Sequence, residues 1–424
     1  MKASVAGNPE TPVDPPPLPP ARKASNFSFF WIRFFVRPAI FLMYRFRFDY
    51  QSSRGIRRPC FILSNHQAVY DQFAAGIGFP FGINFVASDT IFRHGLGSRL
   101  MTAISRPIPF SKGSSDFRAV KNMLDIIRDG GAVAMFPSGN RSFYGDECRI
   151  VPGIGRLAKK FAVPLVLVRL EGGYGTLPRW KAKPNRGKAS GGVARVVSVG
   201  ELERLSGEEV DRIIWQELGH DEFARNAAAR IPFRGKRRAE YLESVLFYCP
   251  ECGAFKAAGR LVSEGNRFSC LDCGAQVGID EFGFFRRERN AGRIPETILE
   301  WSKLQLAHVR GFDFRPFVSV PAFADEGVSL FLAQKARKEH PLGRGRIELF
   351  ADRLRVCGRD FPPADTTMAV QGVRKLTLYL KGEGGKTETY AVTCPFRTCL
   401  MKYMICGWHL RNRALGIKEE YYGY

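Results

Sequence analysis

The chain has 424 residues, 45% of them hydrophobic, which is enough for two or three domains with a sizeable core. Its 64 Lys and Arg exceed 41 Asp and Glu, and the formal net charge of +23 indicates an anionic partner: nucleic acid, a membrane surface or a phosphorylated small molecule. Ten Cys with no secretion signal fit a reducing cytoplasm and argue against a disulfide framework.

The N-terminal region predicts a tail followed by a membrane-surface segment. Residues 1–24 contain the run NPETPVDPPPLPP, which predicts a disordered tail and no signal peptide. Residues 25–48 are rich in Phe but carry four arginines, whereas a spanning helix needs about 20 mostly uncharged residues. Pro38 is expected to end or kink any helix there. We therefore predict one or two short amphipathic helices in the membrane interface, with a core helix of a soluble domain as the alternative.

Residues 49–235 alternate between short apolar runs and segments of helical periodicity. Strands are expected at 59–64, 83–88, 106–110, 132–136, 163–170 and 193–199, and helices at 71–78, 89–104, 115–129, 153–161 and 207–218. In helix 115–129, the expected buried stripe consists of Phe117, Val120, Leu124 and Ile127. This alternation predicts an α/β domain with a mostly parallel sheet flanked by helices, whose ligands gather outside the strand ends.

A histidine with a nearby carboxylate directly follows the first of these strands. In the segment from Asn65 to Asp71, His66 lies at the end of the strand and Asp71 comes five positions later. A carboxylate that orients an imidazole gives a general base. This pair alone is a weak signal, and the segments that follow in order strengthen it.

Two later segments offer groups for an anion. Gly139 lies in a turn after the strand at 132–136, where backbone N–H groups can approach a phosphate, and Arg141 supplies a bidentate fork. Lys112 follows the strand at 106–110. A β-turn and a solvated lysine are the structural alternatives for these residues taken singly.

The ordered set N-H-x4-D, a strand ending in a cation, F-P-x-G-x-R-S and V-P resembles the glycerolipid acyltransferase family, typified by lysophosphatidic acid (1-acylglycerol-3-phosphate) acyltransferases. The resemblance covers residues 26–230. It implies a membrane-associated enzyme on the cytoplasmic face that moves an acyl group from acyl-CoA or acyl-carrier protein to a lysophospholipid, giving phosphatidic acid. His66 would be the base and Asp71 would hold its ring. The acceptor site would comprise Asn65, Lys112, Ser138, Gly139, Asn140 and Arg141.

Two residues depart from the family pattern and leave alternatives open. The family usually has Glu where this chain has Ser138, and Arg where it has Lys112. Ser brings no charge, and Lys is a point charge instead of a fork. A different lysolipid acceptor is therefore one alternative, and a catalytically degenerate zinc-ribbon adaptor at membranes or nucleic acid is another.

A second module is expected over residues 245–280. Two C-x-x-C-G knuckles lie seventeen residues apart, and their four thiolates form a tetrahedral Zn²⁺ site: Cys249, Cys252, Cys270 and Cys273. Four Cys ligands leave no open position, so the zinc is predicted to be structural, with iron as the minor alternative. The basic residues are spread over the whole chain, which disfavours a nucleic-acid partner.

Residues 285–424 predict a C-terminal α+β domain. A helix is expected at 295–309, short strands at 345–350, 353–357, 376–380 and 388–393, and a final helix at 396–413. Short antiparallel strands closed by one helix are the outline of a PH- or GRAM-like barrel. Lipid-headgroup binding, partner docking and a scaffold role all stay open for it.

Overall fold

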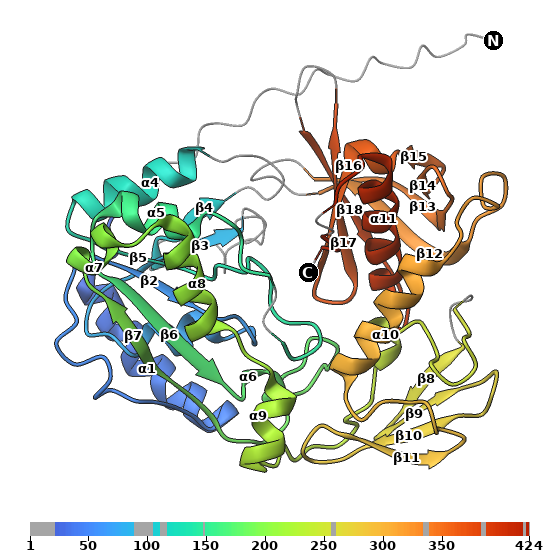
Figure 1. Cartoon of the computed structure of the whole chain (residues 1–424), viewed down its shortest axis with the longest axis horizontal. Helices are drawn as coiled ribbons and strands as arrows, with labels where there is room; N and C mark the ends of the chain where they lie inside the picture. The colour runs from blue at the N-terminus through green and yellow to red at the C-terminus, as the bar shows by residue number, and fades with distance from the viewer. Residues whose placement is uncertain are drawn as a thin grey trace, which may run out of the picture.

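The computed structural model describes residues 22–88, 105–110, 117–146, 149–255, 260–333, 339–382, 387–418 and 421–423. The predicted tail up to residue 21 and the predicted helix at 89–104 lie outside these ranges. The described strands form three sheets, which lie in three adjoining lobes (Figure 1).

The first sheet has the strand order β1-β7-β6-β2-β5-β3-β4. All its neighbouring strands are parallel except β6 and β7, so the predicted mostly parallel sheet is confirmed. The strands are β1 (Phe46–Phe48), β2 (Cys60–Ser64), β3 (Asn84–Ser88), β4 (Ile108–Phe110), β5 (Ala132–Met135), β6 (Leu165–Glu171) and β7 (Ala189–Val197). The site described below lies at the carboxyl ends of β2 and β5.

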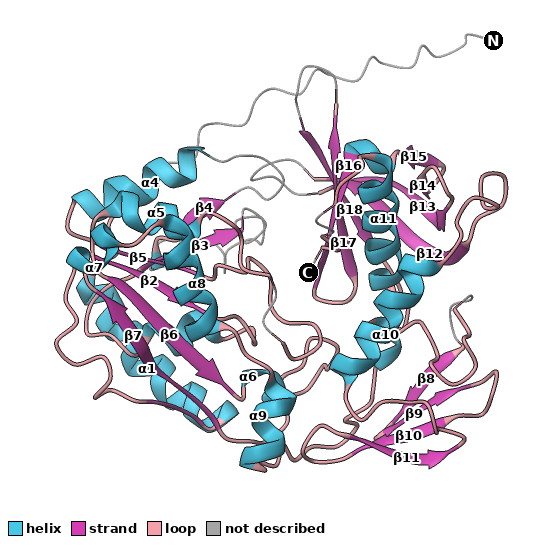
Figure 2. Ribbon diagram, in the orientation of Figure 1, coloured by secondary structure: helices cyan, strands magenta, loops and turns pink. Residues whose placement is uncertain are grey.

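Helices cover both faces of this sheet (Figure 2). They are α1 (Asn26–Tyr44), α2 (Asp71–Gly76), α4 (Phe117–Arg128), α5 (Ile154–Phe161), α6 (Gly173–Thr176), α7 (Val199–Arg204), α8 (Gly207–Leu218) and α9 (Glu222–Ala229). Successive side chains of a strand point to opposite faces. Accordingly, Ile62 packs in the cluster that includes α1 and α2, while Phe61 and Leu63 pack in the cluster with α4, α5 and α8.

Helix α4 corrects one expected stripe. Its buried residues are Ala119, Met123, Ile126 and Ile127, whereas Phe117 is 81% exposed. The helix is turned by about one position from the predicted orientation, so that small Ala119 and flexible Met123 lie against the sheet. The sequence identified the helix correctly but was wrong about part of its buried face.

Helix α1 corrects a second expectation, because it is one continuous helix of 19 residues with Pro38 inside it. Phe29, Ile40 and Tyr44 bury one side, and the Tyr44 ring stacks on Tyr70 with 4.0 Å between centroids. This packing holds both halves of the helix against the sheet, so Pro38 does not end it. By length and composition alone the helix could cross a membrane, with a mean hydropathy of 1.3 and 17% of the window buried.

The second and third sheets are antiparallel throughout. The four-stranded sheet has the order β11-β10-β9-β8, and the seven-stranded sheet has the order β15-β14-β13-β12-β18-β17-β16. The smaller sheet comprises β8 (Leu261–Glu264), β9 (Arg267–Cys270), β10 (Gln276–Ile279) and β11 (Phe285–Arg289). The larger comprises β12 (Phe323–Leu332), β13 (His340–Leu349), β14 (Leu354–Val356), β15 (Arg359–Phe361), β16 (Thr366–Gln371), β17 (Lys375–Lys381) and β18 (Thr387–Thr393). Helix α10 (Ile298–Gly311) joins the two sheets, and α11 (Leu400–Ala414) packs on the larger one (Figure 1).

The predicted short strands and final helix of the C-terminal region are thus present, and β12, β15 and β16 are strands that the sequence analysis missed. The PH- or GRAM-like identity stays a prediction.

One buried cluster runs through all three lobes. It includes Phe143 and Tyr144 of the first lobe, Phe268 of the four-stranded sheet, Trp301 of α10 and Tyr403 of α11. The loop that follows β5 therefore packs against residues far from it in the sequence.

Candidate active site

His66 and Asp71 meet at the carboxyl end of β2. The Nδ1 atom of His66 lies 2.8 Å from Oδ2 of Asp71, the first residue of α2. The same Oδ2 accepts backbone hydrogen bonds from Gln67 N at 2.5 Å and Ala68 N at 2.7 Å. Asp71 is only 1% exposed. Three donors on one oxygen fix the carboxylate, which in turn fixes the imidazole.

Asn65 anchors this turn to the neighbouring strand. Its side chain donates to the carbonyl of Leu170 at 2.8 Å and accepts from the N–H of Leu170 at 2.7 Å. These bonds mimic one rung of a strand pair, so they tie the end of β2 to β6 just before His66. The structure therefore uses Asn65 to position the histidine.

The surroundings of His66 favour its neutral form. Burial is the main cause that lowers the pKa of His66, and the charges of Arg141 and Arg179 lower it further, while the hydrogen bond and charge of Asp71 oppose them. The ring stacks on Phe136 with 4.0 Å between centroids. We assign the Nδ1–H tautomer from the bond to Asp71, which leaves Nε2 as the basic nitrogen.

The segment Phe136–Ser142, named here the acceptor loop, lies beside this histidine. Gly139 has a φ of +67°, a left-handed conformation that favours glycine, and its N–H donates to the carbonyl of Phe136 at 3.0 Å. The N–H of Ser142 donates to the carbonyl of His66 at 2.9 Å, which ties the loop to the base. Burial lowers the pKa of Arg141, and the charge of Asp71 opposes that shift.

The other predicted acceptor residues have different places. Ser138 is buried, and its hydroxyl donates within the loop to the carbonyl of Asn140 at 3.0 Å. Asn140 is half-buried and donates to the segment Tyr421–Gly423. Lys112 lies outside the described residues. The structure thus brings His66, Asp71, Gly139 and Arg141 together, with Ser138 shaping the loop.

Two residues next to the candidate site were not predicted from the sequence. Gln67 accepts hydrogen bonds through Oε1 from the N–H groups of Gly173, at 2.9 Å, and Tyr174, at 3.3 Å, which fixes the start of α6. Arg179 donates to the carbonyl of Arg141 at 2.9 Å. Gln67 could have been suspected because it lies inside the N-H-x4-D segment, but nothing local marks Arg179.

The four cysteines of the second module form one cluster. Their sulfur atoms all lie within 4.8 Å of one another, with Cys249 to Cys273 at 3.9 Å and Cys252 to Cys270 at 3.8 Å. A tetrahedral Zn²⁺ with Zn–S bonds of about 2.3 Å requires sulfur separations of about 3.8 Å. Gly253, at φ +72°, donates its N–H to the Cys249 carbonyl and completes the knuckle turn. The donor set and its spacing fit a structural metal ion.

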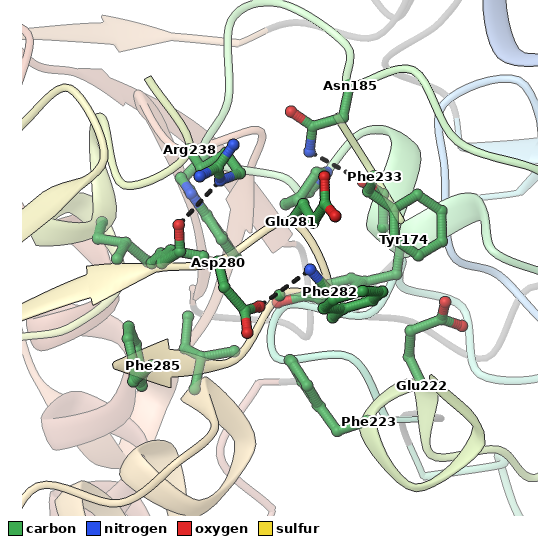
Figure 3. Close-up of a pocket in the computed structure, with 17 residues that line it drawn as sticks. Tyr174, Asn185, Glu222, Phe223, Phe233, Arg238, Asp280, Glu281, Phe282 and Phe285 are labelled. Atoms are coloured by element: carbon green, nitrogen blue, oxygen red, sulfur yellow. Dashed lines mark hydrogen bonds between the residues drawn. The ribbon is translucent and has the colours of Figure 1, made fainter. Parts of the chain in front are cut away.

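A cavity of about 50 Å³ lies apart from His66, between the first lobe and the four-stranded sheet (Figure 3). Its lining includes Tyr174 and Glu222 of the first lobe and Asp280 and Phe282 of the turn between β10 and β11. Its volume admits a few water molecules. We therefore regard it as a packing gap between lobes and place the candidate chemistry at His66.

One comparison with known proteins, the match to a family model, covers this location. Residues 47–171, which include His66, Asp71 and the acceptor loop, match the acyltransferase family. Among solved structures, the chain is similar to the crystal structure of the 1-acyl-sn-glycerophosphate (LPA) acyltransferase PlsC from Thermotoga maritima. The identity is 17% and the TM-score 0.38, over 44% of this chain and 77% of that one. No curated protein matches the chain.

Proposed function

We propose, because residues 47–171 match the acyltransferase family, that the protein transfers a fatty acyl group from acyl-CoA or acyl-carrier protein to the hydroxyl of a lysophospholipid. The proposed acceptor is 1-acylglycerol-3-phosphate and the product phosphatidic acid. The observation that carries the proposal is the His66–Asp71 hydrogen bond of 2.8 Å inside the matched residues.

In the proposed reaction, Nε2 of His66 takes the proton of the acceptor hydroxyl while that oxygen attacks the thioester carbonyl. Asp71 stabilises the imidazolium that forms. The tetrahedral intermediate collapses, the C–S bond breaks, and the imidazolium returns the proton to the thiolate. The thioester is already activated, so an ester and a free thiol form with no covalent enzyme intermediate.

The acceptor loop is suited to the phosphate of the substrate. The guanidinium of Arg141 can bind a phosphate through two parallel hydrogen bonds. It is close enough to His66 for its charge to lower the pKa of that residue, so a phosphate bound there would lie near the base. Arg141 is half-buried. The attraction between its charge and a phosphate is therefore screened less than it would be in water.

We further propose that α1 lies on the cytoplasmic face of a membrane. Phe30, Phe34, Phe35 and Leu42 on the helix are 57%, 60%, 64% and 77% exposed. Large apolar side chains such as these are expected to insert among acyl chains at the interface. In this arrangement the proposed site would lie next to its lipid substrates. The four-cysteine cluster would bind a structural Zn²⁺ that stabilises the second module.

The test uses the purified full chain, labelled acyl-CoA and lysophosphatidate in mixed micelles. We expect labelled phosphatidic acid with the wild type and a loss of about 10²–10⁴-fold in His66→Ala. His340→Ala is the matched control, because His340 is exposed on β13 in another lobe and should retain full activity. Normal turnover by His66→Ala would refute the assigned base.

A second acceptor can be tested in the same assay. The hydroxyl of Ser138 is engaged inside the loop, and the residue brings no charge to the headgroup. A panel of lysolipids with different headgroups therefore tests whether 1-acylglycerol-3-phosphate is preferred. If no lysolipid or glycerol phosphate is acylated, the adaptor alternative replaces the proposal.

A further inference from the structure

The acceptor loop is in contact with the last described segment of the chain. The side-chain amide of Asn140 donates to the carbonyl of Gly423 at 3.2 Å and to the hydroxyl of Tyr421 at 3.4 Å. This segment is itself held on α11: the Tyr421 ring packs edge-on against Trp408 with 4.9 Å between centroids, and Asn412 donates to the Tyr421 carbonyl at 3.0 Å. Asn140 is therefore bonded to an ordered part of the C-terminal lobe.

A second link starts from Arg179, in the stretch that follows α6. One end nitrogen donates to the carbonyl of Arg141 at 2.9 Å, and the other donates to the carbonyl of Val370 in β16 at 3.0 Å. The guanidinium also lies over the Phe143 ring, 3.4 Å from its centroid. A planar fork with two donors can hold two carbonyls at once, whereas a lysine cannot reproduce this geometry.

The two links hold consecutive residues of one short loop. Asn140 is bonded to the Tyr421–Gly423 segment through its side chain, and Arg141 is bonded to β16 through its own carbonyl and Arg179. The following residue, Ser142, is bonded to the backbone of His66. The distance between the Arg141 guanidinium and the His66 imidazole therefore depends on contacts supplied by the C-terminal lobe.

We propose that the seven-stranded lobe positions the acceptor loop, with Arg179 and Tyr421 as positioning residues for binding of the phosphate-bearing acceptor. This inference rests on the proposed function for the identity of the ligand. The C-terminal lobe is then a structural part of the acceptor site. A displacement of the Arg141 guanidinium by about 1 Å is enough to weaken a bidentate phosphate contact strongly.

The test compares Arg179→Lys and Tyr421→Ala with the wild type. Arg179→Lys keeps the positive charge near His66 and removes the guanidinium that holds the carbonyls of Arg141 and Val370. We expect the KM for the lysolipid acceptor to rise about 5- to 30-fold in each variant, because one or two directed hydrogen bonds are lost. The KM for acyl-CoA and the kcat should stay within about threefold. Hydrogen exchange of the amides of residues 137–146 should accelerate in both variants.

Arg359→Lys is the matched control. Its guanidinium also lies over an aromatic ring, that of Tyr390 at 4.6 Å, but in β15 at the far edge of the same sheet. This control should leave the acceptor KM and the exchange of the loop unchanged. Thermal melting shows whether a variant is folded, and Tyr421→Ala provides the result if Arg179→Lys is unstable.

The outcomes separate this inference from the proposed function. An active wild type whose acceptor KM is unchanged in both variants overturns the positioning role and leaves the acyltransferase proposal standing. A wild type inactive on every acceptor overturns the proposed function. In that case faster exchange of residues 137–146 in the variants still supports the positioning role, and unchanged exchange overturns it.

Discussion

The role of Asp71 can be tested by Asp71→Asn, which keeps the size of the side chain and removes its charge. The Asn carbonyl can take the place of Oδ2 and accept from His66 Nδ1, Gln67 N and Ala68 N. Its amide nitrogen then takes the place of Oδ1, which has no hydrogen-bond partner within the described ranges. One buried, unpaired donor costs about 1–3 kcal/mol, so the variant should fold with a melting temperature a few degrees lower.

The catalytic loss follows from the distance between the two groups. At 2.8 Å and an effective dielectric constant of about 20, an imidazolium and a carboxylate attract each other by about 6 kcal/mol. The amide loses most of this attraction when His66 takes up a proton. The loss of activity cannot exceed what the general base itself contributes to the rate, so kcat/KM should fall about 10²–10⁴-fold.

The assay follows release of the free thiol from acyl-CoA at saturating lysolipid, for Asp71→Asn, His66→Ala and the double variant. Because Asp71 acts through His66, the double variant should be no slower than His66→Ala alone. Asp71 raises the pKa of His66, so residual activity in Asp71→Asn should persist to lower pH than in the wild type. Activity of Asp71→Asn within threefold of the wild type, or a double variant far slower than His66→Ala, would contradict the reasoning.

Three further predictions concern pH, metal and membrane. Burial lowers the pKa of His66 below 6.5, so the kcat/KM of the wild type should decline only at pH values below 6.5. Arg179→Gln removes a charge that lowers this pKa and should shift the decline to higher pH, whereas Arg179→Lys keeps the charge and should leave the decline where it is. Elemental analysis should find about one zinc per chain, and a strong chelator should lower the melting temperature of the wild type but not of Cys270→Ala, which lacks a ligand from the start. The double variant Phe34→Ser/Phe35→Ser should bind anionic vesicles at least about 10-fold more weakly in sedimentation, whereas Val320→Ser, exposed in a different lobe, should bind as the wild type does.

Short-range spacing made the centre of the site predictable. His66 and Asp71 are five residues apart, and the Cys knuckles each span four, so the sequence itself contains the geometry of these pairs. The alternation of strands and helices likewise predicted the first sheet. Nothing in the local sequence indicated that β6 and β7 pair antiparallel.

Long-range contacts account for what the sequence did not predict. Asn140 and Gly423 are 283 positions apart, and Arg179 and Val370 are 191 apart, so no local pattern connects them. The rotation of α4 and the continuity of α1 through Pro38 also depend on packing against the sheet. In both helices tertiary contacts outweighed the local preference.

The cluster shared by the three lobes has a consequence for how this chain could be divided into fragments. Phe143 and Tyr144 directly follow the acceptor loop and are each 1% exposed, in a cluster with Phe268, Trp301 and Tyr403. A fragment that stops at residue 171, where the family match ends, would expose these rings to water beside the acceptor loop. A unit that folds on its own is therefore expected to be larger than residues 47–171, because the later lobes supply part of the packing around the acceptor loop.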